Sequence, residues 1–346
     1  MFDELCAWEN LLRAYRRASK GKRGHRNVAA FEFRLEDNLI ALQDELTSGT
    51  YRPGPYVNFV IHEPKRRLIS AAPFRDRVVH HALCNLIEPV FERTFVSSSY
   101  ANRVGKGSHR ALGHAQRLAR RYRYVLRCDV RQFFPSIDHQ ALRALLSRKL
   151  PDPQVMNLID RILASGAHVH EEAFDMVFFR GDDLFAALRP RGLPIGNLTS
   201  QFWANVYMNP LDHFVKRELR CQGYVRYVDD MLLFANEKGT LHEWLRGISE
   251  RLAWLRLVLH EAAHAVPVTE GFPFLGFTVF PWRRRLKRRK GIHFQRRLKR
   301  LVLDNRARKV TDGALLASLR GWINHVRFAN TVGLRTAVLR GCRLLP

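Results

Sequence analysis

Two adjacent aspartates between two apolar runs constrain this chain more than any other feature. Residues 224–235 read YVRYVDDMLLFA, and Asp229 and Asp230 divide the run into two short apolar arms. Such arms on either side of a polar pair predict a β-hairpin with both carboxylates at its turn. Adjacent carboxylates repel, and partial burial makes each one costly unless a cation neutralises it. The pair is either an ordinary turn, the commoner origin of this dipeptide, or a cation site.

A third aspartate favours the cation site. Residues 124–130 read YVLRCDV, a short apolar run that predicts a buried strand ending at Asp129, 100 residues before Asp229. A carboxylate from a neighbouring strand would complete the oxygen ligands that Mg²⁺ prefers. Two such ions about 4 Å apart activate an attacking 3′-hydroxyl and stabilise a leaving pyrophosphate. We therefore expect a catalytic metal site at these three residues.

A second Asp-Asp pair lies in a different context. Asp182 and Asp183 follow Gly181, and the apolar run MVFF precedes them. No second strand-like arm follows before Pro190. This pair is therefore predicted to lie in an exposed loop.

The charge of the chain points to a polyanionic partner. With 58 basic and 32 acidic residues among 346, the net charge is +26 and the pI about 10.8. Nucleic acid, an anionic membrane surface and mere arginine-rich composition would each explain such a balance. The distribution favours nucleic acid, because residues 283–300 hold eleven Lys or Arg and residues 271–303 hold no acid. Such a run resembles a phosphate-contact surface.

Cysteine usage and hydropathy indicate a cytoplasmic protein. The five cysteines are far apart and form no CxxC pair, which excludes a zinc ribbon and a disulfide scaffold. No run of 18 apolar residues predicts a membrane span. The first residues, MFDELCAWEN, lack the basic and apolar pattern of a signal peptide.

The order of the predicted elements indicates an α+β fold. Residues 5–48 show two helical patterns, and residues 51–80 predict a hairpin around a basic turn. Helices, a strand ending at Asp129, a helix that begins at an Asp138 N-cap, a long helix after residue 192 and the Asp-Asp hairpin follow. We expect a domain built around an antiparallel sheet, followed by a small basic helical domain.

Several motifs together resemble those of reverse transcriptases, over about residues 50–280. The palm motifs A, B and C and the strand after them are DVRQFFPSIDH, GLPIGNLTSQFWANVYMNPLDHFVK, YVRYVDDMLLF and FPFLGF; the fingers blocks are PKRRLISAAPFRDRVVHHAL and FVSSSYANRVGKGSHRAL. The resemblance implies a right-hand polymerase fold, with fingers, an antiparallel-sheet palm and a short helical thumb. We expect N-terminal helices, fingers and part of the palm in 1–120, the palm in 121–282 and a basic helical thumb in 283–346.

Two segments resemble one subfamily of reverse transcriptases in particular. The segment IGNLTSQ and the N-terminal ENLLRAYRRASKGKR resemble the reverse transcriptases of diversity-generating retroelements, where many relatives have Gln-Gly in place of Ile195-Gly196. That resemblance implies copying of a template-repeat RNA into cDNA with errors at template adenines, and an oligomeric, basic accessory variability protein as partner. A phage-defence or retron-type reverse transcriptase and a non-catalytic RNA-binding protein stay open as alternatives.

The resemblance also assigns site residues. Asp129 and Asp229 would hold two Mg²⁺ ions, which Mn²⁺ can replace, supported by Asp230 and the backbone carbonyl of Val130. Phe134 falls at the position of an aromatic gate against the ribose 2′-hydroxyl. The remaining residues implied to contact the dNTP are Lys65, Arg67, Ile195 and Gly196, with Arg66 as an alternative to Arg67.

Template and primer contacts are expected from basic and polar positions along the chain. These are Arg75, Arg103, Lys106, Gln201, Arg283, Arg284, Lys287 and Arg288. His264 stands beside Ala263, where relatives often carry a lysine thought to protonate pyrophosphate. His264 is therefore either a general acid or an ordinary surface histidine. Trp322 is expected to be a core residue of the thumb.

Overall fold

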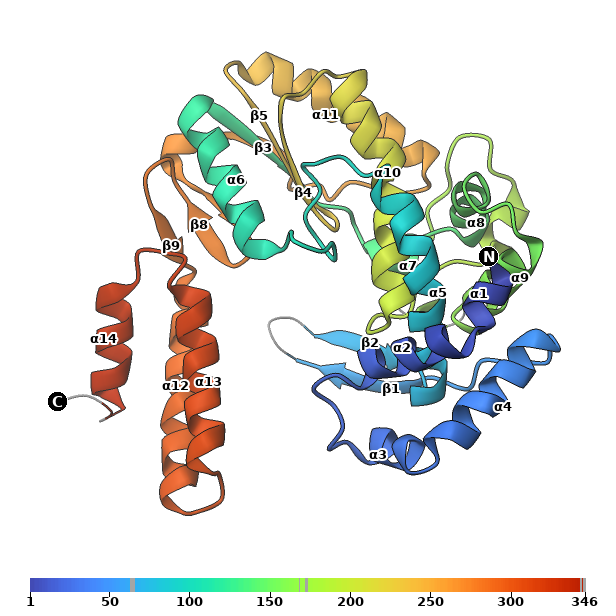
Figure 1. The fold of residues 1–346 in the computed structure, drawn as a ribbon. Coiled ribbons are helices and arrows are strands. Elements are labelled where there is room, and N and C mark those ends of the chain that lie inside the picture. The colour runs from blue at the N-terminus through green and yellow to red at the C-terminus, as the bar shows by residue number, and fades with distance from the viewer. Residues whose placement is uncertain (63–65, 168, 172–173, 343, 345–346) are drawn as a thin grey trace. The chain divides into compact units, whose positions relative to one another are not determined.

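The computed structural model describes residues 1–62, 66–167, 169–171, 174–342 and 344 (Figure 1). These residues form two compact units. Unit 1 comprises Met1–Arg103, Asp129–Arg220 and Leu245–Glu261. Unit 2 comprises Val104–Cys128, Cys221–Trp244 and Ala262–Pro346. The domain boundaries expected from the sequence stay a prediction.

Unit 1 is mainly helical. Its elements are α1 (Phe2–Cys6), α2 (Trp8–Ser19), α3 (Arg26–Phe33), α4 (Leu35–Thr47), β1 (Val57–Ile61), β2 (Arg67–Ala71), α5 (Phe74–Glu92), α7 (Phe133–Ser136), α8 (His139–Ser147), α9 (Pro153–Ser165), the 3₁₀ helix η2 (Leu184–Leu188), α10 (Leu198–Arg217) and the end of α11 (Lys238–Trp254). In α2, Leu11, Ala14, Tyr15 and Ala18 are buried. Their spacing of three and four residues makes one apolar face, which packs against α5.

Two N-caps fix where helices of unit 1 begin. The Asp138 carboxylate accepts a hydrogen bond from the Ala141 N–H at 2.8 Å, which confirms the predicted cap of α8. Asp152 accepts bonds from the N–H groups of Gln154 and Val155, with Pro153 at the first position of α9. Each cap satisfies donors that the first helical turn leaves unpaired.

Unit 2 contains the expected antiparallel sheet. Its four strands lie in the order β4 (Gly223–Tyr227), β5 (Asp230–Ala235), β3 (Tyr124–Cys128) and β6 (His264–Pro267). All three pairings are antiparallel, with Cys128 opposite Met231 and Tyr227 opposite Asp230. β5 is buried from Met231 to Ala235, and α6 (Ser108–Arg121) packs against the sheet. The predicted hairpin is confirmed.

The rest of unit 2 forms a small sheet, a short 3₁₀ helix and three α-helices. The elements are η3 (Val268–Glu270), β7 (Phe272–Phe274), β8 (Phe277–Val279), β9 (Arg284–Leu286), α12 (Arg288–Arg306), α13 (Asp312–Val326) and α14 (Val332–Gly341). α12 and α13 lie side by side (Figure 1). Their core includes Phe294 and Trp322, whose rings stack with centroids 4.3 Å apart. Trp322 is thus a core residue, as expected.

The architecture confirms the α+β class, with antiparallel sheets and a helical C-terminal part. Within the described residues, no helix has the length and apolar character needed to cross a membrane.

Candidate active site

The Asp-Asp pair lies at a two-residue turn between β4 and β5. Tyr227 pairs with Asp230, so Val228 and Asp229 form the turn itself. Val228 has a φ of +59°. That left-handed backbone is costly for a β-branched residue, whose branched side chain crowds the following carbonyl. Strain of about 1–3 kcal/mol persists where surrounding structure enforces it, commonly at functional sites.

Two arginines surround this turn, and sequence reasoning missed both. Arg226 is completely buried on β4, and its guanidinium donates to the Val228 carbonyl at 2.9 Å. On β3, the Nε of Arg127 donates to Oδ1 of Asp230 at 3.1 Å. The signal was an arginine inside each of two apolar strands, since arginine is rarely buried without a partner. The Arg127 contact gives Asp230 a cationic partner from the protein itself.

Asp129 immediately follows β3 and belongs to unit 1. Its carbonyl accepts from the His260 N–H at 2.8 Å, and the Arg131 N–H donates to the Val258 carbonyl at 2.8 Å. These bonds flank the bridge between Val130 and Leu259. Because backbone groups of successive residues point to opposite edges of a strand, the Val130 carbonyl is directed away from this pairing.

The donor set suits a hard divalent cation in kind. Carboxylates from Asp129, Asp229 and Asp230 and the carbonyl of Val130 all offer oxygen, the ligand that Mg²⁺ prefers. In the described part of the chain, no three His, Cys, Asp or Glu side chains are gathered closely enough to hold a metal ion. Within unit 2, the structure joins Asp229 and Asp230 on one hairpin and links Asp230 to Arg127.

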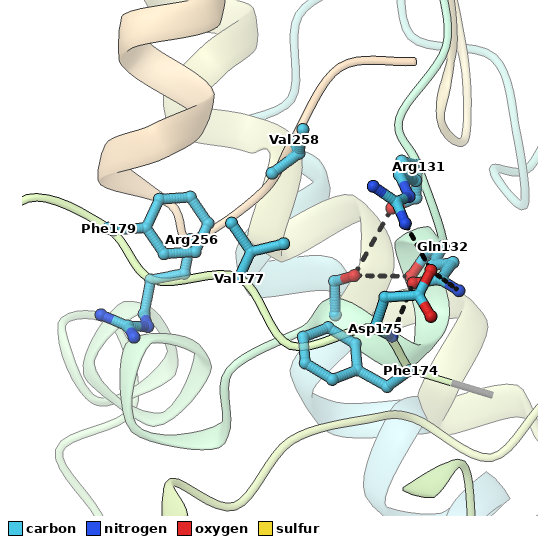
Figure 2. Close-up of a pocket in the computed structure, with 9 residues that line it drawn as sticks. Arg131, Gln132, Phe174, Asp175, Val177, Phe179, Arg256 and Val258 are labelled. Carbon is cyan, nitrogen blue, oxygen red and sulfur yellow. Dashed lines mark hydrogen bonds and ion pairs between the residues drawn. The ribbon is translucent and has the colours of Figure 1, made fainter. Parts of the chain in front are cut away.

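The turn after Asp129 is held by an aspartate that the sequence analysis did not single out. Gln132 has a φ of +45°, and its side chain makes a reciprocal pair with Asp175. Its Oε1 accepts from the Asp175 N–H at 3.1 Å and its Nε2 donates to the Asp175 carboxylate at 3.2 Å. Arg131 also binds this carboxylate, as Figure 2 shows. The surrounding pocket has about 10 Å³ of interior, room for about one water and no substrate.

The two phenylalanines of this turn differ in exposure. Phe133 is buried, whereas Phe134 is half-buried, with their ring centroids 5.5 Å apart. The Phe134 carbonyl accepts from the Leu193 N–H at 2.9 Å. Phe133 is therefore a core residue, and part of the Phe134 ring stays accessible.

The segment before α10 is bound to β2. Gly196 has a φ of +118°, and a Cβ there would lie 2.9 Å from Cγ2 of Ile69, so both backbone and space require glycine. The buried Asn197 accepts from the Ala72 N–H at 3.0 Å and donates to the Ser70 carbonyl at 2.8 Å. The Ile195 carbonyl accepts from the Ser70 N–H at 2.9 Å. Asn197, another residue the sequence analysis missed, thus holds Ile195 and Gly196 against β2.

The proposed triphosphate contacts are only partly described. Lys65 lies outside the described residues. Arg67 is the first residue of β2, pairs with Ile61, and is exposed, as is Arg66.

Some expected template contacts have protein partners. The Arg103 side chain is 6% exposed; it binds both oxygens of Glu92 and donates to the carbonyls of Val96 and Ser99. Arg75 forms an ion pair with Glu45. These contacts favour a structural role for both arginines.

The segment with this geometry matches a known protein family. The model of the reverse transcriptase (RNA-dependent DNA polymerase) family matches residues 61–279, more than half of the chain. The chain belongs to this family. Its matched segment contains the strained hairpin, the turn after Asp129 and the Gly196 turn. Membership of this family identifies the chain as an RNA-directed DNA polymerase.

Two relatives and one solved structure are similar to this reverse transcriptase at low sequence identity. Protein YkfC of Escherichia coli K12 is 26% identical over 295 residues, which cover 72% of this chain and 73% of YkfC. The group II intron-encoded protein LtrA of Lactococcus lactis subsp. cremoris is 26% identical over 183 residues, 52% of this chain and 28% of LtrA. A telomerase structure from Candida albicans aligns with a TM-score of 0.47 and 11% identity, over 84% of this chain and 55% of that one.

Other expected site residues of this reverse transcriptase lie in unit 2. Arg284 is half-buried and donates to Gln116 at 2.9 Å and to the Phe328 carbonyl at 3.1 Å, and burial lowers the pKa of its guanidinium. Arg283, Lys287 and Arg288 are exposed at the start of the basic segment, beyond the matched residues.

His264, Lys106 and Gln201 complete the expected set. His264 is exposed on β6, opposite Arg127, and its Nδ1 lies 2.7 Å from the Ala262 carbonyl. If Nδ1 donates a hydrogen bond to that carbonyl, Nε2 is the ring nitrogen that points away from it. Lys106 and Gln201 are half-buried, and Gln201 lies in the first turn of α10.

Proposed function

We propose that this reverse transcriptase extends a DNA primer on an RNA template by two-metal phosphoryl transfer. Asp129 and Asp229 would hold the ions, with the Val130 carbonyl and Asp230 in support. Bound Mg²⁺, or Mn²⁺ in its place, supplies activation of the primer 3′-hydroxyl and charge neutralisation at the leaving pyrophosphate. The carrying observation is the β4–β5 turn, where a strained backbone holds Asp229 between two paired strands.

Other side chains have separate proposed roles in the reaction. Arg127 orients the Asp230 carboxylate, because its Nε donates to Oδ1 of Asp230 at 3.1 Å. The accessible Phe134 ring would collide with a ribose 2′-hydroxyl and so select dNTPs. Lys65 and Arg67 would bind the triphosphate, whose negative charge grows during transfer. His264 would donate a proton to pyrophosphate.

Primer extension on an RNA template with Mg²⁺ and dNTPs tests the assignment. We expect Asp229→Asn to abolish extension, because it removes a charged oxygen ligand without changing side-chain size. The matched control is Asp37→Asn, the same substitution at an exposed position of α4, which should extend normally. Extension by Asp229→Asn at the wild-type rate would contradict the metal assignment.

We further propose that the chain serves a diversity-generating retroelement. It would copy a template-repeat RNA into cDNA with errors at template adenines, alongside an oligomeric accessory variability protein. The support is the IGNLTSQ pattern and the half-buried Ile195 at the place of a hydrogen-bonding glutamine. An aliphatic side chain there cannot hydrogen-bond the incoming nucleotide, which weakens selection against mispairs.

Sequencing the extension products tests this subfamily. We expect substitutions mainly at template adenines, fewer of them with Ile195→Gln, and an unchanged pattern with Ile195→Leu as the control. Faithful products from the wild-type chain would instead favour a phage-defence or retron-type enzyme. Failure to extend even with the accessory protein and cognate RNA would favour a non-catalytic RNA-binding protein.

We also propose that this reverse transcriptase acts in the cytoplasm. All five cysteines are buried as thiols, and none belongs to a disulfide. Thiols of this kind persist in a reducing compartment.

A further inference from the structure

The short helix η2 presents three large apolar side chains to solvent. Leu184, Phe185 and Leu188 are 85%, 74% and 77% exposed, and Phe178 shortly before them is 56% exposed. One exposed leucine is ordinary on a protein surface, but several within one short segment mark an interaction surface. We call Leu184, Phe185 and Leu188 the η2 cluster.

Both ends of η2 are anchored. Before the helix, Asp182 binds Arg256 through two bonds of 2.6 and 2.7 Å. After it, Arg189 binds Asp138 through two bonds of 2.6 and 2.9 Å. Two-point pairs between arginine and a carboxylate fix orientation as well as distance. The predicted exposed loop around Asp182 is thus an anchored segment in which Asp182 has a structural partner.

The base of the helix is fixed as well. The Asp183 carboxylate accepts from the Ala186 N–H at 3.1 Å, and Ala186 is buried. Phe179 lies over the Arg256 guanidinium, 5.2 Å from it (Figure 2). The η2 cluster is therefore displayed by a firmly held backbone, which reduces the entropy lost when a partner covers it.

Local charge argues against nucleic acid as the partner. Residues 171–188 contain five acids and one base in a chain whose net charge is +26. Three of the guanidiniums next to η2 are bound to protein groups, Arg189 and Arg256 to aspartates and Arg191 to backbone carbonyls and the Met176 sulfur. A phosphate backbone is bound by several exposed cations, and Arg180 is the one basic residue of this segment.

The same charge pattern favours a second copy of the chain. A chain of +26 repels its copies over most of its surface, but arginines next to η2 are paired with aspartates. Arg180 and Asp183 are both exposed and of opposite sign, just before the η2 cluster. A two-fold axis places the same residues on both sides of an interface, so Arg180 of each copy can meet Asp183 of the other around an apolar centre.

We propose that two copies of this chain dimerise symmetrically through η2. The η2 cluster forms the apolar centre of the interface, and Arg180 and Asp183 form its charged rim. The inference does not depend on the retroelement assignment, because it rests on the exposure, anchoring and charge of this segment alone.

Sedimentation of the purified full chain in 0.3 M salt, which screens the overall repulsion, tests the proposal. We expect a monomer–dimer equilibrium between about 1 and 100 µM, the range of modest interfaces. Leu184→Ser with Leu188→Ser should raise the dimer Kd about tenfold or more. Phe33→Ser, at an 89% exposed phenylalanine in α3, is the control and should not change it. A wild-type chain that stays monomeric, or a dimer unaffected by the double variant, overturns the proposal.

A double-mutant cycle tests the two-fold arrangement. Arg180→Glu should weaken the dimer, because the new carboxylate would face Asp183 of the other copy. In the background of Asp183→Asn, which retains an oxygen to cap η2, the same change should cost several-fold less. Equal costs in both backgrounds would show that the two side chains do not meet, and would overturn the symmetric interface. Circular dichroism of each variant checks that the fold is retained.

Discussion

Val228 shows how one residue can be held against its own preference. At a φ of +59°, its side chain would favour another backbone conformation, yet the paired strands on either side keep the turn to two residues. The buried Arg226 adds a hydrogen bond to the Val228 carbonyl. Together these contacts fix the position of Asp229 more tightly than a flexible turn would.

Val228→Gly should therefore raise stability and lower activity. Glycine adopts positive φ without steric cost, so we expect the free energy of unfolding to rise by about 1 kcal/mol. A freer turn should slow primer extension. Urea unfolding and extension rates measure both effects. The control, Val225→Gly at a buried position of β4, should instead lose about 3 kcal/mol. A loss of stability at Val228→Gly would mean that its backbone is not strained.

Gly196→Ala should lower both stability and activity. Its φ of +118° and the 2.9 Å approach to Ile69 leave no room for a methyl group. We expect a loss of about 1–3 kcal/mol and slower dNTP incorporation, because Ile195 is displaced. Gly239→Ala, where a Cβ meets nothing within 4 Å in α11, should stabilise the protein by up to about 1 kcal/mol. Equal effects of the two variants in thermal unfolding would contradict this reasoning.

At the scale of an element, α5 carries two adjacent histidines, of which His80 is buried and His81 half-buried. Burial lowers the pKa of His80 to about 3 and that of His81 to about 4. The Nδ1 of His80 is buried and has no hydrogen-bond partner in the described structure. As the pH falls below about 6.5, the ordinary pKa of histidine, these two residues therefore take up protons in the unfolded chain before they do so in the folded protein.

The protein is therefore expected to become less stable as the pH falls below about 6.5. Stability contributed by neutral His80 is complete above pH about 6.5 and falls as the pH drops toward its folded pKa. Between pH 7.5 and 5.5, we expect His80 alone to lower the free energy of unfolding by about 1 kcal/mol. Urea unfolding at both pH values measures it. His80→Gln should lose that part of the slope, and a slope identical to wild type would contradict the assignment.

At the scale of the whole molecule, net charge and its distribution govern nucleic-acid binding. Eight of the 19 residues of α12 are Lys or Arg, and Arg296 and Arg297 are both exposed. Each cation that neutralises a phosphate releases a counterion, so it contributes to the salt dependence of binding. The helix is therefore expected to contact the template–primer backbone.

Neutralising α12 should weaken binding and its salt dependence together. Arg296→Gln with Arg297→Gln should reduce the slope of log K against log salt by about 1–2 units in a titration with single- or double-stranded RNA. The control is Arg148→Gln with Lys149→Gln, which removes the same charge just after α8. Equal slopes for the two double variants would mean that only net charge matters, not the placement of the basic helix.

The sequence by itself determined the local elements and the family. The hairpin at Asp229 and Asp230, the strand before Asp129, the Asp138 cap and the core position of Trp322 all follow from short-range patterns. Apolar periodicity and capping chemistry act over a few residues, so they can be read without knowing the rest of the fold. The reverse transcriptase motifs were recognisable for the same reason.

Only the tertiary structure decided which polar groups meet. Arg127 reaches Asp230 from a strand about 100 residues earlier in the chain, and Asp182, in the predicted loop, pairs with Arg256. Asp175 holds the turn after Asp129, and Asn197 holds Ile195 against β2. Such contacts depend on sheet order and on how loops return across the fold. Residue types and spacing do not specify them, because many partners of suitable charge are available along a chain this rich in arginine.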